Sequence, residues 1–250
     1  MNATPSPTAS QCCLPSYFAM LHFGKDLGQA CIDIALRIHG NQHAQPRRFL
    51  PSIGAAMATE TVDALAKQAL DLAKNALLVH VRFMNAAFAR LRPLPIPGST
   101  LATDGTHIRY DSAAIARMYA EEPASVARGF LHVILHNVFL HLYPSSKVDA
   151  LRWDTACDIA VEHVISELDL PAARTQRAAK QNAAIARITA ALDIVTAETI
   201  YRYLVDTVAD DEEVKRMREA FIVDDHGPWH TMAAEEEARR QAKERKHVEE

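Results

Sequence analysis

Two histidines four residues apart are the strongest chemical signal in the sequence. His132 and His136 lie in the run Leu-His-Val-Ile-Leu-His, inside a long apolar stretch that predicts a buried helix. On a helix this spacing puts both imidazole rings on one face, roughly 40° apart around the axis. Two neutral imidazoles so placed can chelate one divalent ion, whereas a lone helical histidine is usually explained by a hydrogen bond. We therefore expect a metal at this helix, with zinc as the preferred ion.

Three other histidines stand near these residues or near the end of the chain. His141 follows His132 by nine residues, which on an unbroken helix turns its side chain roughly 180° away. We therefore expect His141 to contact other groups rather than the ion. His226 and His230 flank a Gly-Pro pair and could also reach a metal, but their segment is typical of a polar connector.

The next predicted helix carries acidic residues at the same spacing. Asp154, Asp158 and Glu162 recur at four-residue steps among apolar neighbours, so they line one face. Buried carboxylates need a cation or hydrogen-bond donors, and an ion held by the two histidines would satisfy them. Asp158, the central acid, is the predicted third ligand.

Three roles are open for Glu162: a further ligand, a residue that orients a ligand imidazole, or the catalytic general base. An alternative for the whole row of acids is a solvent-facing stripe that pairs with the basic segment after Pro171.

These side chains must be positioned by a mainly α-helical fold. Apolar periodicity and capping residues predict helices at about 59–83, 112–119, 124–143, 150–170 and 197–208. Asp104-Gly105 predicts a two-residue turn in one small β-hairpin at about 99–110, after an extended Pro-rich stretch. The folded domain is expected to span 57–208, between an N-terminal extension at 1–56 and a connector with a charged tail at 209–250.

Composition narrows the class of protein. The 250 residues are 49% hydrophobic, which is enough for a sizeable core. A net charge of −4 argues against nucleic acid as a partner. We find no secretion signal, no apolar run near the roughly 20 residues that span a bilayer, and no CxxC pair among the four cysteines. A cytoplasmic protein that does not bind a membrane is expected.

The order of these motifs resembles a known family. The hairpin segment Ala102 to Asp111, the Leu131-His-Val-Ile-Leu-His136 motif and the Trp153-Asp-Thr-Ala-Cys-Asp158 motif are similar to the metallopeptidase-like domain that precedes a von Willebrand factor A-like domain in bacterial proteins. The resemblance covers about 57–208. It implies a zincin-like helical fold, His132, His136 and Asp158 as metal ligands, and cooperation with an AAA+ ATPase.

Two departures from that family affect the expected function. The glutamate that follows the first histidine in His-Glu-x-x-His zincins, and acts as their general base, is replaced by Val133. The von Willebrand-like half that the resemblance implies does not follow the connector, where a charged tail stands instead, so we expect either a truncated chain or one that has lost this half.

Three functions follow as alternatives. The first is a zinc-dependent peptidase acting on a peptide substrate, with Glu162 as the catalytic acid or base. The second is a catalytically silent, metal-stabilised scaffold that works with a protein partner, such as an ATPase or a von Willebrand-type protein. The third is a helical interaction protein without metal. Val133 favours the second over the first.

Overall fold

The structure is a computed structural model that describes residues 53–145 and 147–249. Contacts divide the chain into two units, 1–46 and 47–250, and all described residues belong to the second. This unit is mainly helical with a small three-stranded sheet, which confirms the predicted fold class. Most of the predicted extension at 1–56 lies outside the described residues. No helix in the described part is both long and apolar enough to cross a bilayer.

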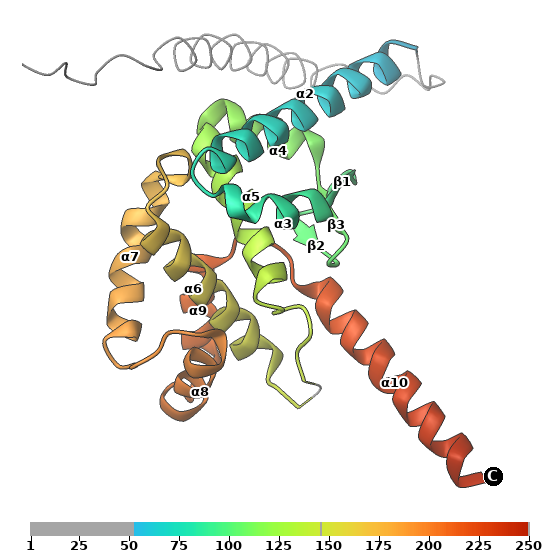
Figure 1. The fold of residues 1–250 in the computed structure, drawn as a ribbon, viewed down its shortest axis with the longest axis vertical. Coiled ribbons are helices and arrows are strands. Elements are labelled where there is room, and N and C mark those ends of the chain that lie inside the picture. Colours follow the sequence, from blue (N-terminus) through green and yellow to red (C-terminus); the bar gives the residue numbers. More distant parts are fainter. Residues whose placement is uncertain (1–52, 146, 250) are drawn as a thin grey trace, which may run out of the picture. The chain divides into compact units, whose positions relative to one another are not determined.

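In the described part of the chain, five helical segments precede residue 146. They are α2 (Ile53–Leu78), η1 (Arg82–Met84), α3 (Asn85–Arg90), α4 (Ser112–Glu121) and α5 (Pro123–Val138). α2 begins before its predicted start at about residue 59, and it packs against α4 and α5 (Figure 1). α4 begins at the predicted residue, and the Asp111 carboxylate caps it by accepting a hydrogen bond from the backbone N–H of Ala114 at 2.7 Å.

The other helices that the structure describes follow residue 146. They are α6 (Ala150–Leu168), η2 (Pro171–Ala173), α7 (Gln176–Thr189), α8 (Ala197–Thr207), α9 (Asp211–Phe221) and α10 (Gly227–Glu249). Asp149 caps α6 through the N–H of Arg152, and Thr196 forms a capping box with Thr199 at α8. α6 packs on α5, α7, α8 and α9, so it is the central helix of this half.

The sheet contains the predicted hairpin and one additional strand. β2 (Ala102–Thr103) pairs antiparallel with β3 (His107–Tyr110), and β1 (Arg92–Pro95) pairs parallel with β3 at the other edge. The prolines of β1 are tolerated because they lie on an edge strand. The prediction of a two-residue turn is wrong, because Thr103 pairs with Ile108 and the connection is therefore longer. The Asp104 carboxylate stabilises this longer loop by accepting hydrogen bonds from the backbone N–H groups of Thr106 and His107.

Helix α5 ends earlier than the sequence predicts. It was expected to continue to about Tyr143, yet it ends at Val138. Leu140 adopts a left-handed conformation with φ +60°, and the backbone N–H of His141 donates to the carbonyl of His136 at 3.0 Å. The chain therefore folds back over the end of α5.

The core around α6 extends past the predicted end of the domain at Val208. Val214 and Phe221 of α9 and Trp229 of α10 are fully buried, together with apolar residues of α6 and α8. The Trp229 indole N–H donates to the carbonyl of Thr103 at 3.1 Å. The segment after residue 208 therefore packs as part of the same unit.

Candidate metal centre

Helix α5 brings the two predicted histidines together in the interior. His132 and His136 are fully buried, and their Nε2 atoms lie 2.9 Å apart. Two ring nitrogens at this distance need a shared proton or a shared cation between them. The four-residue spacing thus places the rings as the sequence predicts.

Helix α6 adds Asp158 to the same point. Its Oδ1 lies 3.3 Å from Nε2 of His132 and 3.4 Å from Nε2 of His136. Asp154, Asp158 and Glu162 are all buried, so the alternative of a solvent-facing acidic stripe is wrong.

A fourth residue, Asp224, comes from the segment after α9. Its Oδ1 lies 3.4 Å from Nε2 of His132 and 3.8 Å from Nε2 of His136. The backbone holds this segment in place, because the N–H of Asp225 donates to the carbonyl of Leu101 at 2.7 Å beside β2. Gly129 of α5 leaves room for Leu101 and Val223, since an added Cβ would lie 3.2 Å from the Leu101 side chain and 3.6 Å from the Val223 side chain.

These four residues form one compact group of potential ligands. Each offers one donor atom, and all four atoms lie within 4.8 Å of one another. Tetrahedral ligands about 2.0 to 2.1 Å from zinc would lie about 3.3 Å from each other. The distances from the histidine Nε2 atoms to the other donor atoms run from 2.9 to 3.8 Å, a range that includes this value.

Unpaired oxygen atoms at the group agree with a bound cation. Oδ2 of Asp158 and Oδ2 of Asp224 are buried without a hydrogen-bond partner. Leaving such atoms unpaired is costly, and two carboxylates offset the charge of one divalent ion. The residues present therefore fit a divalent metal.

The charges of the group also shift its protonation. Burial alone would lower the pKa of His132, but hydrogen bonds with Asp158, Asp224 and Glu162 raise that pKa well above 6.5. Burial lowers the pKa of His136 to about 4. The pKa of Asp158 falls well below its ordinary value, because the surrounding histidines outweigh its burial. Protons on the histidines, or a bound cation, would therefore balance the negative charge of the buried carboxylates.

His141 does not point away from the site as predicted. The early end of α5 returns its ring to His136, with 3.0 Å between the two Nδ1 atoms. Burial lowers the pKa of His141 to about 3. The expectation failed because it assumed an unbroken helix. His141 is not part of the compact four-residue group and lies behind His136.

The connector interpretation missed Asp224 and underrated His226. His226 is buried and stacks on Trp229 with 3.7 Å between ring centroids. Its Nε2 lies 3.1 Å from Oδ1 of Asp158 and 3.0 Å from Oδ1 of Asp224. The available signal was the Asp-x-His pattern at 224–226 beside a tryptophan, which is unusual for an exposed linker.

Glu162 lies on the far side of His132 from this group. Its Oε1 is 2.7 Å from Nδ1 of His132, and its Oε2 accepts from Nε of Arg128 at 2.9 Å. Both oxygens therefore have partners. Val133, at the position of the usual zincin base, is fully buried and has no group that could transfer a proton.

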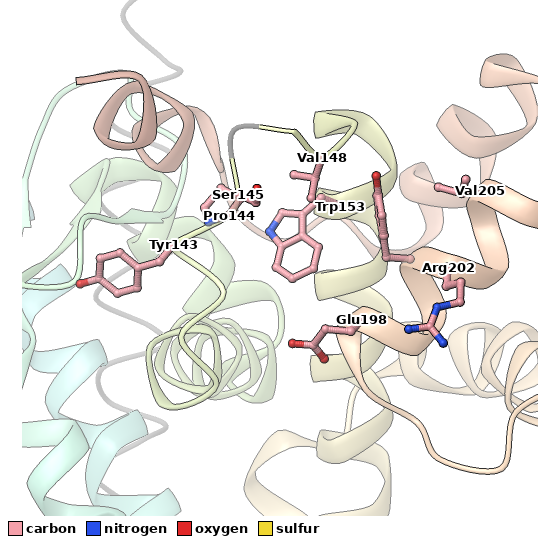
Figure 2. A pocket seen from close by; sticks show the side chains of 9 residues that line it. Tyr143, Pro144, Ser145, Val148, Trp153, Glu198, Arg202 and Val205 are labelled. Carbon is pink, nitrogen blue, oxygen red and sulfur yellow. The ribbon is translucent and has the colours of Figure 1, made fainter. Parts of the chain in front are cut away.

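A surface pocket lies beside the site without including it. This cavity of about 420 Å³ is lined by apolar and aromatic residues of the 143–153 region and α8. Figure 2 shows Trp153 in the middle of the labelled side chains, with Glu198 and Arg202 on the α8 side. The Trp153 indole N–H donates to the carbonyl of His141 at 3.3 Å. Trp153 therefore contacts His141 and also lines the pocket.

Comparison with known proteins gives a family for the chain. A family model described as "Putative metallopeptidase domain" matches residues 65–250, which is more than half of the sequence. No curated protein and no solved structure matches the chain. The matched region contains all four residues of the compact group. With most of its length and its buried His/Asp centre inside this match, the chain belongs to that metallopeptidase-domain family.

Proposed function

We propose that the protein holds one divalent cation, zinc by preference, at His132, His136, Asp158 and Asp224. The observation that carries this proposal is the set of four buried donor atoms within 4.8 Å of one another. Two imidazole nitrogens and two carboxylate oxygens are ligands that zinc accepts in tetrahedral sites.

The ion's role in this proposal is structural. Four protein ligands fill a tetrahedral site, whereas catalytic zinc usually keeps three protein ligands and one open position. Val133 cannot act as a base, and both oxygens of Glu162 already have partners. The centre then joins α5, α6 and the segment at Asp224, in a catalytically silent, metal-stabilised scaffold. Of the three roles open for Glu162, this geometry favours the orientation of His132.

Peptide hydrolysis is the second candidate, and family membership together with one detail of Asp224 favours it. If His132, His136 and Asp158 alone hold the ion, Asp224 has a buried oxygen without a partner. That carboxylate would accept the proton of the attacking water, in the role of the absent glutamate. A bound ion would supply positive charge for a polarised carbonyl.

A scaffold of this kind works through other proteins, and we propose a protein partner. Val138, at the end of α5, and Phe139, Leu140 and Tyr143, in the loop that follows, have exposed apolar or aromatic side chains. Clustered exposed apolar residues are typical of binding surfaces. An AAA+ ATPase or a von Willebrand-type protein is the partner that the family resemblance suggests, and cross-linking in cell extract followed by mass spectrometry tests it.

Metal analysis of the full chain, purified without chelator, tests the main proposal. We expect about one zinc per chain in the wild type and none in His136→Ala. The exposed His80 provides a matched control, because His80→Ala should keep the metal. Wild-type protein without metal, even after addition of zinc, would overturn the proposal.

Peptide hydrolysis by three proteins separates the two candidates. The structural proposal predicts no hydrolysis by the wild type and none by Asp224→Asn. Metal-dependent hydrolysis by the wild type that is lost in Asp224→Asn would favour the peptidase. Activity that appears only in Val133→Glu would identify a zincin site that lost its base and would support the silent scaffold.

A further inference from the structure

A line of buried charged contacts leads outward from His132. Nδ1 of His132 lies 2.7 Å from Oε1 of Glu162, and Nε of Arg128 donates to Oε2 of Glu162 at 2.9 Å. Nη2 of Arg128 contacts the same oxygen. The side chains of His132 and Glu162 are fully buried, and that of Arg128 is 8% exposed. Both carboxylate oxygens are therefore engaged away from water.

The contact with Glu162 distinguishes the two nitrogens of the His132 ring. A carboxylate at Nδ1 favours the proton on that nitrogen, which leaves the lone pair of Nε2 for a metal. Nε2 is the atom that faces Asp158 and Asp224, at 3.3 and 3.4 Å. His136 has no such carboxylate at Nδ1, which lies 3.0 Å from Nδ1 of His141. His132 is thus the ligand whose ring orientation is fixed by charge.

Arg128 is itself held from the other side. Its Nη1 donates to the carbonyl of Ala173 at 3.1 Å, and its Nη2 lies 3.3 Å from Oε1 of Gln181. The Gln181 amide in turn donates to the carbonyl of Ala220 at 3.1 Å. A guanidinium can make these contacts and still bind a carboxylate with two N–H groups, which a lysine ammonium cannot reproduce. The site therefore holds Arg128 in one position.

The sequence offers a reason for this residue. Arg128 precedes His132 by four residues on α5, so the two side chains share a face. Without Arg128, Glu162 would be a buried charge with only a histidine partner, and such charges are costly. Arg128 therefore allows a charged carboxylate to remain at Nδ1 of His132.

We infer that Arg128 and Glu162 are positioning residues for the metal centre, acting through His132. Arg128 fixes Glu162, and Glu162 fixes the His132 ring with Nε2 toward the ion. This inference rests on the proposed metal function and adds two residues that do not touch the ion.

Metal affinity of the full chain tests the inference. Zinc affinity is measured by competition with a chromophoric chelator for the wild type, Glu162→Gln, Arg128→Met and Arg128→Lys. Loss of a partner behind a ligand histidine typically costs 10- to 100-fold in affinity, so we expect a loss of that size in Glu162→Gln and Arg128→Met. Arg128→Lys keeps the positive charge, so its loss of zinc affinity should be smaller than that of Arg128→Met. Glu167 is exposed on α6, the helix of Glu162, and gives the matched control Glu167→Gln, which should bind zinc with wild-type affinity.

A second readout separates positioning from general loss of stability. The visible absorption spectrum of the Co²⁺-loaded protein reports ligand geometry, and it should change in Glu162→Gln but not in Glu167→Gln. Circular dichroism of each metal-free variant checks the fold, and Arg128→Lys remains as the conservative variant if Arg128→Met does not fold.

The two proposals fail in different ways. Wild-type zinc affinity and an unchanged Co²⁺ spectrum in folded Glu162→Gln and Arg128→Lys would overturn the inference and leave the metal centre intact. A wild-type chain that binds neither ion would overturn the metal centre and the inference with it.

Discussion

At the scale of single residues, Asp224 determines how much positive charge the buried centre must hold. It is 2% exposed, its Oδ1 faces three histidines, and its Oδ2 has no hydrogen-bond partner. A second carboxylate this close to Asp158 would repel it unless positive charge lies between them. Protonated histidines can supply that charge, and so can a divalent ion.

A pair of adjacent substitutions tests Asp224 as a ligand. Asp224→Asn should lower zinc affinity by more than the roughly 100-fold that loss of an outer partner costs, because a neutral amide is a much weaker ligand. Asp225→Asn removes the neighbouring acid, which is exposed and accepts from the N–H of Gly227, and should leave zinc affinity unchanged. Competition titrations measure both, and equal affinities for the two variants would exclude Asp224 from the ligand set.

At the scale of the elements, local signals predicted the starts of helices better than their ends. The helices predicted to begin near 112, 150 and 197 do begin there, and Asp111, Asp149 and Thr196 cap them, because a cap depends only on a side chain and the next few N–H groups. The end of α5 has no such signal. Its apolar run continues to Leu142, and only the left-handed Leu140 breaks the helix.

The left-handed residue gives a stability prediction. Leu140 is 64% exposed, and a non-glycine residue at its φ costs roughly 1 to 2 kcal/mol. Leu140→Gly should raise the free energy of unfolding by about 0.5 to 1 kcal/mol, since glycine relieves that strain but loses more chain entropy. Val138→Gly should lower it by a similar amount, because Val138 is the last helical residue of α5. Urea denaturation measures both, and a destabilised Leu140→Gly would contradict the argument.

The hairpin loop gives a prediction on pH. Burial alone would raise the pKa of Asp104, but hydrogen bonds from the backbone of His107 and Thr106 and from Arg109 lower it from 3.8 to about 2. A depressed folded-state pKa stabilises the protein above pH 4, and this contribution is lost as the pH falls toward 2. After a discount for solvent exposure it is about 1 kcal/mol.

Urea denaturation of the wild type and Asp104→Asn from pH 7 to pH 2 measures that contribution. The variant should be less stable by about 1 kcal/mol at pH 7, and the difference should shrink below pH 4. A difference that stays constant down to pH 2 would show that the charge of Asp104 does not matter.

At the scale of the whole molecule, the sequence predicted only those site residues that lie close together along the chain. His132, His136 and Asp158 lie on two consecutive helices, and their spacing alone predicts that they share faces. Asp224 and His226 reach the same place from beyond α9, through backbone contacts with the loop before β2. Such a contact depends on tertiary packing across more than 100 residues of chain. The local pattern at 224–226 indicates burial, but it does not tell which residues pack against it.

The same packing predicts that the chain after residue 208 is needed for the fold. A chain ending at Val208 lacks three large buried residues, Val214, Phe221 and Trp229, as well as Asp224. Loss of a single buried aromatic residue of this kind costs about 3 to 5 kcal/mol, a large part of the 5 to 15 kcal/mol that stabilises a typical domain. We expect this shortened chain to lack cooperative unfolding and to bind no zinc. A chain ending at Glu236 keeps the whole buried set and should retain both properties. Calorimetry and metal analysis compare the two, and a folded, zinc-binding chain that ends at Val208 would contradict both the extended core and the role of Asp224.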